Sequence, residues 1–174
     1  MGVQPAADQG SPLEGLLPES AIQVGVSVAD WREAVRAVGR CLVEAGATSD
    51  AYTDEMIATV EELGPYIVIA PGIALAHARP SPAVHRIGIG LVTLDPAVPF
   101  GHQENDPVRI VIGLAATDNE GHVGALASLA GFLADDARRD ALLGARDARA
   151  VRDLFAAWRT SEPPQQEGAD AHRA

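Results

Sequence analysis

The apolar and polar residues of the N-terminal half follow a helical period in two segments. Between Trp31 and Gly46, apolar side chains recur at the three-to-four-residue spacing of one buried helix face. Asp30 precedes this stripe and Glu33 stands three places later, a pattern typical of a helix N-cap. A second helix is expected from about Ser49 to Leu63. The sequence thus predicts a helix pair ahead of the main strands.

Short apolar runs rich in β-branched residues come next, and such runs are typical of buried strands. They are Tyr66–Ala70, His85–Leu94 and Pro107–Ala116, and Ala74–Ala78 can form a further strand. Turn-forming residues follow two of these runs, at Asp95-Pro96 and Thr117–Gly121. The last third of the chain is helical in pattern, with breaks near Asp135 and Gly144.

This order of elements, a helix pair, then strands, then helices, predicts an α/β fold. We expect a three-layer sandwich, in which a mixed sheet of about four to five strands has helices on both faces. The pattern does not reveal the strand order. The polar, proline-containing ends indicate disordered tails at residues 1–19 and 160–174, which leaves one domain over residues 20–159.

Composition and charge restrict the partners. The 174 residues carry a formal charge of −11, whereas nucleic acids and anionic membranes are held mainly by basic patches. We therefore expect no nucleic acid partner and no direct membrane insertion, and an acidic surface suits a basic protein partner. All 13 basic residues are arginine. The absence of lysine excludes Schiff-base chemistry and any P-loop that needs a lysine.

The cysteine count and the apolar runs bear on cellular location. Cys41 is the only cysteine, so the sequence offers no internal disulfide and no multi-cysteine metal site. It lies on the apolar stripe of the first helix, where a free cysteine commonly packs in the core. No run approaches the roughly 18 apolar residues of a spanning helix, and the first residues lack the regions of a signal peptide. The sequence predicts a cytoplasmic protein.

His77 lies near the end of the stretch "GPYIVIAPGIALAHARP", residues 64–80. Strand alternation turns it to the side of the buried residues of its run, so a core histidine bonded to a carbonyl is one interpretation. Small alanines on either side leave the ring accessible, and Arg79 can place a guanidinium beside it. A cation there keeps the imidazole neutral and offers donors to a phosphoryl group. The combination also suits a nucleophile that accepts phosphate.

His122 is the second candidate, because it falls in the first turn of a predicted helix that Asp118 or Asn119 can cap. The helix dipole, free backbone N–H groups and a second imidazole favour an anion bound between His122 and His77. The plain alternative is a polar residue at a helix start. His102 precedes a strand in a loop with turn chemistry, and His85 falls at a strand entrance.

Other catalytic arrangements lack their sequence signals. No pair of histidines has the i, i+4 spacing of a helix or the H-x-H spacing of a strand that metal sites commonly use, and no cysteine assists. The G-x-S-x-G elbow of serine hydrolases is also missing. Residue chemistry alone therefore stops at an α/β domain with a nucleophilic or acid-base histidine.

Two stretches carry a resemblance to a known family. Residues 64–80, together with "GLVTLDPAVPFGHQENDPVRIVIGLAATDNEGH" at residues 90–122, resemble the enzyme IIA component of the sugar phosphotransferase system (PTS), of the fructose-mannitol superfamily. The resemblance covers about residues 20–158. Its "GPY" and "NDPV" stretches look most like the ascorbate-specific type. It implies the fold of the mannitol-type enzyme IIA.

The resemblance also implies a function and its residues. The family takes a phosphoryl group from the phosphocarrier protein HPr onto a histidine and passes it to a cysteine of enzyme IIB, which works with the membrane enzyme IIC. His77 matches the phosphoryl acceptor, and His122 matches the second histidine that holds the phosphoryl group. Arg79 is a candidate for electrostatic support from its position alone. No metal or cofactor is expected.

This chain departs from the family pattern at two positions. Relatives often have proline where this chain has Ala76, and mannitol-type relatives carry an arginine in the helix that ends near residue 63, where this chain has only glutamates. The leading interpretation is transport of a sugar-like substrate, and the subtype that the chain most resembles makes L-ascorbate the expected substrate. A regulatory module whose phosphorylation state controls a transcription or transport partner is the alternative. The two departures motivate a third, a domain that has lost phosphorylation.

Overall fold

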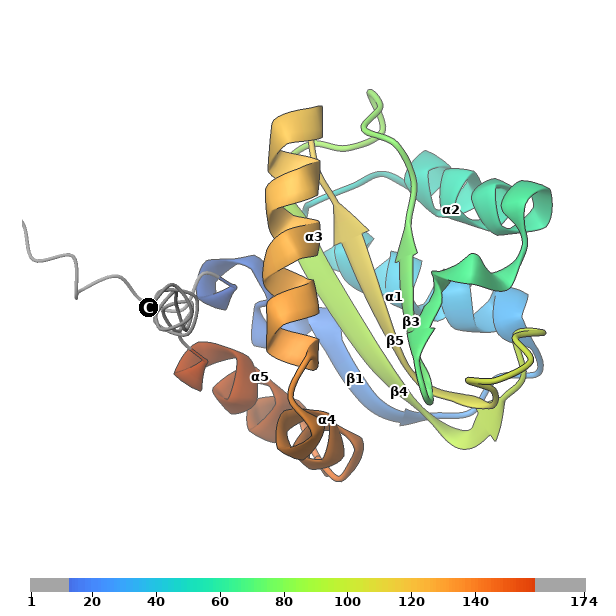
Figure 1. Ribbon diagram of the computed structural model, residues 1–174. Helices are drawn as coiled ribbons and strands as arrows, with labels where there is room; N and C mark the ends of the chain where they lie inside the picture. The colour runs from blue at the N-terminus through green and yellow to red at the C-terminus, as the bar shows by residue number, and fades with distance from the viewer. Residues whose placement is uncertain (1–12, 159–174) are drawn as a thin grey trace, which may run out of the picture.

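A five-stranded mixed sheet forms the centre of the fold. The computed structural model describes residues 13–158. The strand order is β1-β4-β5-β3-β2, with β1 parallel to β4, β3 parallel to β5, and the other two pairs antiparallel (Figure 1). The strands are β1 (Ile22–Val26), β2 (Val68–Ala70), β3 (Ile73–His77), β4 (Gly88–Val98) and β5 (Val108–Ala115).

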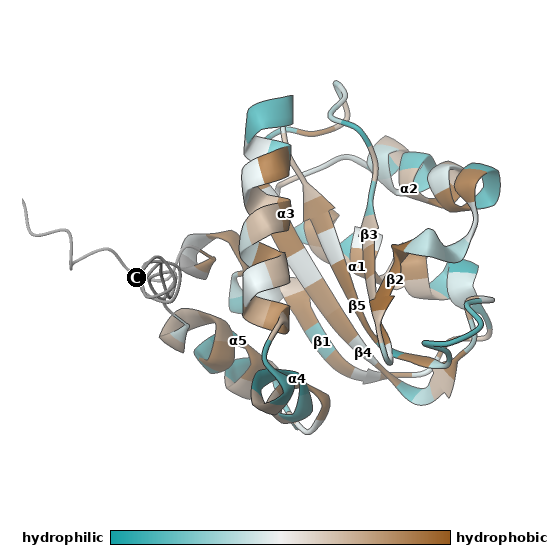
Figure 2. Ribbon diagram, in the orientation of Figure 1, coloured by the Kyte–Doolittle hydropathy of each residue, from teal (hydrophilic) through white to brown (hydrophobic). Residues whose placement is uncertain are grey.

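Helices cover both faces of this sheet, so the predicted α/β three-layer sandwich is confirmed (Figure 1). One layer holds α1 (Trp31–Glu44) and α2 (Asp50–Leu63), and the other holds α3 (Asn119–Leu133), α4 (Asp136–Leu143) and α5 (Ala148–Ala157). Three short 3-10 turns complete the described chain: η2 (Glu14–Leu16), η3 (Glu19–Ala21) and η4 (Pro65–Ile67). Hydrophobic residues concentrate on the strands between the layers (Figure 2). Within residues 13–158 no helix has both the length and the apolar character to cross a bilayer.

In the described part of the chain, aspartate side chains cap α1, α3, α4 and α5, whereas α2 starts without a side-chain cap bond. The Asp30 side chain accepts a hydrogen bond from the Glu33 N–H, and Glu33 in turn accepts one from the Ala29 N–H, so two otherwise unpaired N–H groups at the start of α1 are satisfied reciprocally. The Asp135 side chain caps α4 by accepting a hydrogen bond from the Arg138 N–H. The predicted first and second helices and the breaks in the C-terminal third are confirmed.

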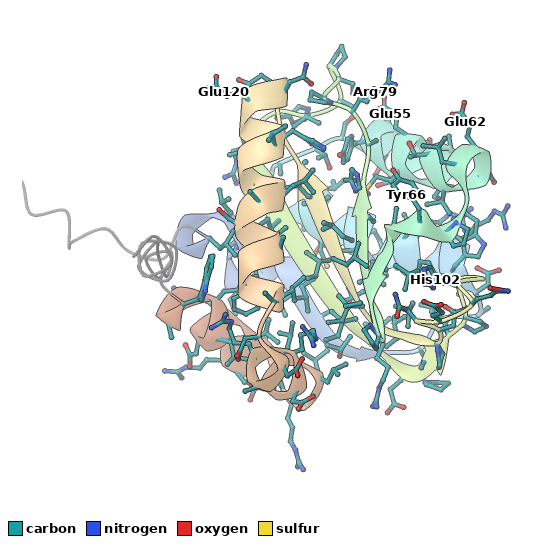
Figure 3. The ribbon with its side chains drawn as sticks, viewed as in Figure 1. Glu55, Glu62, Tyr66, Arg79, His102 and Glu120 are labelled. Atoms are coloured by element: carbon teal, nitrogen blue, oxygen red, sulfur yellow. The ribbon has the colours of Figure 1, made fainter. Side chains whose placement is uncertain are left out.

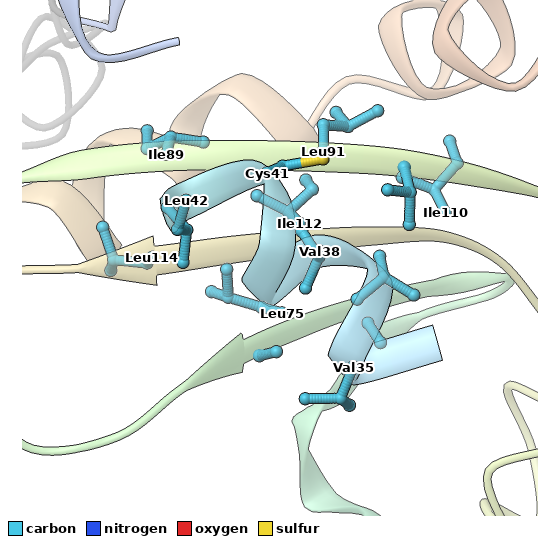
Figure 4. Packing of buried hydrophobic residues seen from close by; sticks show 14 of the residues in the cluster. Val35, Val38, Cys41, Leu42, Leu75, Ile89, Leu91, Ile110, Ile112 and Leu114 are labelled. Carbon is cyan, nitrogen blue, oxygen red and sulfur yellow. The ribbon is translucent and has the colours of Figure 1, made fainter. Parts of the chain in front are cut away.

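A row of small residues lets α1 lie close to the sheet. Gly113 of β5 pairs in register with Ala76 of β3 on one side and Gly90 of β4 on the other. A Cβ on Gly113 would lie 3.1 Å from the Val38 side chain, and one on Gly90 would lie 3.2 Å from Cys41 Cβ. Both contacts are with α1, whose buried side chains lie against the sheet in Figure 4.

The large aliphatic residues of the same strands point the other way. Because side chains alternate along a strand, the neighbours of the small row, Leu75 and Ile112, face the layer that contains α3. His77 alternates in phase with Leu75 and therefore also faces α3. The sheet thus separates a closely packed α1 face from a face that carries the candidate histidine.

Two strand expectations were wrong in detail. Val68–Ala70 is an edge strand whose Ile69 is exposed, and the residues before it form the turn η4, so the run Tyr66–Ala70 is not a buried strand. β4 begins at Gly88, three residues after His85, and runs through Asp95-Pro96 to Val98, where a turn was predicted. Its pairing with β5 is irregular between Thr93 and Val98, which accommodates the proline.

The N-terminal segment packs further than its composition indicates. Leu13 and Leu17 are fully buried, and the short strand β1 follows at the sheet edge. Within 13–19 the chain therefore belongs to the packed domain and not to a tail. The pattern analysis missed β1, although Ile22, Val24 and Val26 alternate with polar or small residues. The remaining tail predictions, for residues 1–12 and 160–174, lie outside the described residues.

Gly39→Ala tests the contact between α1 and α2. A Cβ at position 39 would lie 2.2 Å from Thr53 Oγ1 and 2.9 Å from Thr53 Cβ, so rotation of the threonine cannot relieve the overlap. We expect the free energy of unfolding to fall by about 1–3 kcal/mol. Urea unfolding measures it. The control is Gly124→Ala in α3, where a Cβ meets nothing within 4 Å and stability should rise by about 0.5–1 kcal/mol. Unchanged or increased stability in Gly39→Ala would contradict the close approach.

Candidate active site

His77 is the last residue of β3, and its ring is held by its own strand. The Nδ1 atom lies 3.1 Å from the backbone oxygen of Leu75, and the side chain is half-buried. A carbonyl oxygen only accepts hydrogen bonds, so this contact requires the proton on Nδ1. The lone pair of the neutral ring is then on Nε2. His77 is therefore oriented as a nucleophile that uses Nε2.

His122 lies in the first turn of α3. Asp118 caps this helix, accepting from the Gly121 N–H at 2.7 Å through its side chain and from the His122 N–H at 3.0 Å through its backbone. The expected cap at Asp118 is confirmed. These two N–H groups are already used inside the cap, so they are not free to hold an anion. What His122 brings to the site is its imidazole.

The fold brings the two imidazoles together. The ring centroids of His77 and His122 are 5.4 Å apart, and the rings are tilted by 48°. His122 Nδ1 is buried and has no hydrogen-bond partner within the described residues, so Nε2 is the nitrogen that remains to meet a ligand. Burial lowers the pKa of His122, and the charge on a protonated His77 lowers it further. His122 is therefore neutral at neutral pH.

Tyr66 is a third ring at this site, and the residue-level analysis did not single it out. Its ring packs edge-on to His77 with centroids 6.2 Å apart, and its side chain is 48% exposed. An exposed aromatic ring in contact with a candidate nucleophile offers apolar area to a docking partner. The sequence feature that could have identified Tyr66 is the "GPY" stretch, which forms the start of the turn η4.

A cleft of about 470 Å³ opens beside His77, between α2 and the segment that follows β3. Arg79 is exposed and lines the cleft with His77, opposite Glu55 and Glu62 of α2 (Figure 3). β3 ends at His77, so the strand spacing that we used to place Arg79 beside the ring does not apply. Arg79 nevertheless is the one basic residue, within residues 13–158, that lines this cleft.

His102 lies away from this pair. His102 is in the loop before β5, where its Nδ1 accepts hydrogen bonds from the Glu104 and Asn105 N–H groups. In the same loop the Asp106 carboxylate accepts from three backbone N–H groups, including that of His102. Figure 3 places His102 at a distance from Tyr66 and Arg79. The turn chemistry predicted for this loop is confirmed.

The described residues were also searched for a metal site. Within residues 13–158, no three side chains of histidine, cysteine, aspartate or glutamate converge in a way that could hold a metal ion. Cys41 belongs to α1 and is fully buried, and burial raises the pKa of its thiol to about 11. The thiol is therefore protonated and inert at neutral pH.

Two adjacent imidazoles at one end of a covered α/β sheet are an arrangement suited to group transfer, and comparison with known families gives the family. The model of the family described as "Phosphoenolpyruvate-dependent sugar phosphotransferase system, EIIA 2" matches residues 15–158. This chain belongs to that family.

Individual relatives agree with this assignment. The chain is 37% identical over 144 residues to the ascorbate-specific PTS system EIIA component of Salmonella typhimurium, covering 82% of this chain and 93% of the relative. The crystal structure of IIA mannitol from Escherichia coli superposes with a TM-score of 0.70 at 30% identity, covering 80% of this chain and 98% of that one. A complex of enzyme IIAMTL with phosphorylated enzyme IIBMTL, also from E. coli, gives 0.72 at 28% identity, covering 82% and 100%.

An NMR titration of the histidine rings tests the coupling between the two imidazoles. We expect the pKa of His122 to lie below the ordinary histidine value. In His77→Gln it should rise only part of the way back, because burial is the larger cause and remains. His85→Gln, at an exposed position outside the site, is the control and should leave the His122 titration unchanged. A complete return to the ordinary value in His77→Gln would show that the His77 charge is the main cause.

Proposed function

We propose that this protein is a phosphoryl carrier of the sugar phosphotransferase system. It accepts a phosphoryl group from HPr on His77 and passes it to a cysteine of enzyme IIB, with L-ascorbate as the transported substrate. The observation that carries the proposal is the His77–His122 pair, with ring centroids 5.4 Å apart beside an open cleft, in a chain of the EIIA family.

The bonding of His77 supports Nε2 as the acceptor atom. In the first step the Nε2 lone pair attacks phosphorus, the N–P bond of the donor phosphohistidine breaks, and its electron pair stays on the donor ring. In the second step a cysteine thiolate attacks the same phosphorus and the electron pair returns to Nε2. The Leu75 carbonyl holds the Nδ1 proton throughout, so it stabilises the positive charge that the ring gains when it is phosphorylated.

His122 and Arg79 are suited to the oxygens of the phosphoryl group. Transfer of this group depends mainly on in-line positioning and on stabilisation of its equatorial oxygens. The unpartnered Nδ1 of His122 favours the tautomer with the proton on Nε2, because an unsatisfied buried lone pair costs less than an unsatisfied N–H. His122 then donates a hydrogen bond from Nε2. Arg79 supplies a positive charge from the rim of the cleft.

The surface around the pair suits protein partners. The described residues include four large apolar side chains that are well exposed, and three of them adjoin the site: Leu63, Tyr66 and Val123. Leu63 and Tyr66 line the His77 cleft, and Val123 follows His122. Glutamates of α2 flank this apolar surface, which favours a partner with a basic rim. The complex of a related enzyme IIA with its phosphorylated enzyme IIB supports enzyme IIB as one partner.

Phosphorylation of three variants tests the acceptor. Incubation with phosphoenolpyruvate, enzyme I and HPr should give wild type an acid-labile phosphate on a histidine, measured by intact mass and by ³¹P NMR. His77→Ala should lose it completely. His122→Ala should still accept phosphate, but onward transfer to enzyme IIB should be about 10- to 100-fold slower because one oxygen-stabilising donor is lost. His85→Ala is the control and should match wild type. An unlabelled wild type would refute the carrier function.

Discharge of the phosphorylated protein tests the substrate class. We expect rapid transfer to an ascorbate-type enzyme IIB and at least about tenfold slower transfer to a mannitol-type enzyme IIB, since partner choice reflects differential affinity. The relatives named ascorbate-specific support this order. The reverse order would overturn ascorbate as the substrate. Labelling at His77 without discharge to either protein would instead favour the regulatory module.

A further inference from the structure

Tyr52 contacts the residue that follows His77, and the function proposed above does not use it. It belongs to the first turn of α2, its side chain is fully buried, and its ring is among the largest buried side chains. Its hydroxyl oxygen lies 2.9 Å from the Ala78 nitrogen, 2.8 Å from the Leu114 oxygen and 3.1 Å from the Ala78 oxygen. A buried tyrosine on the apolar face of a helix is ordinarily a core residue. The hydroxyl of Tyr52, however, contacts backbone atoms next to the candidate nucleophile.

These contacts join the two strands where the site begins. His77 and Leu114 are the last register pair of β3 and β5. The Tyr52 hydroxyl accepts from the Ala78 N–H and has one proton to donate, for which the Leu114 oxygen is the nearer acceptor. The hydroxyl therefore extends the link between the strands by one residue beyond His77. Burial raises the pKa of Tyr52 to about 12, so the hydroxyl keeps both roles at neutral pH.

A second contact from α2 holds the same segment. The Ser81 hydroxyl donates to Glu55 at 2.7 Å and accepts from the Ala83 N–H at 3.1 Å. Tyr52 and Glu55 are three residues apart and so lie on one face of α2. Between their two attachment points stands Arg79, which has to be oriented toward the cleft that it lines. One face of α2 thus fixes the backbone on the C-terminal side of His77.

We propose that Tyr52 is a positioning residue for phosphoryl transfer. Its hydroxyl holds the Ala78 backbone so that the His77 ring, already bonded to Leu75 through Nδ1, presents Nε2 in one direction. The inference rests on the proposed phosphoryl-carrier function. Tyr52 does not touch the phosphoryl group. It acts through the backbone next to His77, and in-line transfer is sensitive to displacements of about 1 Å.

Tyr52→Phe removes the hydroxyl and keeps the ring that fills the core. We expect the maximal rate of His77 phosphorylation by phospho-HPr to fall about tenfold, while the KM for phospho-HPr changes less than about twofold because the docking surface is untouched. In ¹⁵N NMR the His77 ring should change from a single Nδ1–H tautomer to a mixture. The Ala78 amide should lose its protection from hydrogen exchange.

Val151→Ala is the matched control for a purely structural effect. Val151 is fully buried in α5, in the opposite helix layer, so its truncation lowers thermal stability without touching β3. Its transfer rate and His77 tautomer should match wild type. A wild-type rate in Tyr52→Phe, or an equal rate loss in both variants, would overturn the positioning role. A wild type that is not phosphorylated at His77 would refute the carrier function. An unchanged His77 tautomer in Tyr52→Phe would refute the role of Tyr52 independently of that function.

Discussion

The close approach of α1 to the sheet is the constraint on which the rest of the structure depends. Ala76, Gly113 and Gly90 form a row across three strands, and a Cβ on either glycine would press against α1. Since strand side chains alternate, the residues next to this row, such as Leu75, face the other layer. His77 follows that alternation and faces α3. Ala76, where the resemblance to the family leads us to expect proline, is a buried member of this row.

The site is assembled from elements that stabilise one another. The end of β3 supplies His77, the capped start of α3 supplies His122, and α2 holds the backbone beyond β3 through the hydroxyl of Tyr52. Burial keeps His122 neutral, so it serves as a hydrogen-bond donor and not as a fixed charge. The cleft wall on α2 carries glutamates, and Arg79 alone opposes them among the described basic residues. In the phosphoryl transfer that we propose, neutral donors therefore have to supply much of the stabilisation.

Local chemistry explains which parts of the fold were predictable. α1 was predictable because its cap, Asp30, is adjacent in sequence to the stripe that it starts. β1 was missed because five residues at a sheet edge give a weak pattern, and β4 passes through Asp95-Pro96 because its pairing with β5 resumes beyond the proline. Leu13 and Leu17 looked like tail residues, since only the packed domain provides the surface that buries them.

The sequence by itself determined the helices, part of the strands, the acidic character of the chain and the two histidines as candidates, because caps, periodicity and side-chain chemistry are local properties. The tertiary structure alone decided that His77 and His122 meet, that Arg79 reaches the cleft without belonging to the strand, and that Tyr52 bridges Ala78 and Leu114. The Tyr52 bridge depends on the strand order β5-β3 and on the layer in which α2 packs. Such contacts join residues far apart in the chain, and no local pattern encodes their distance.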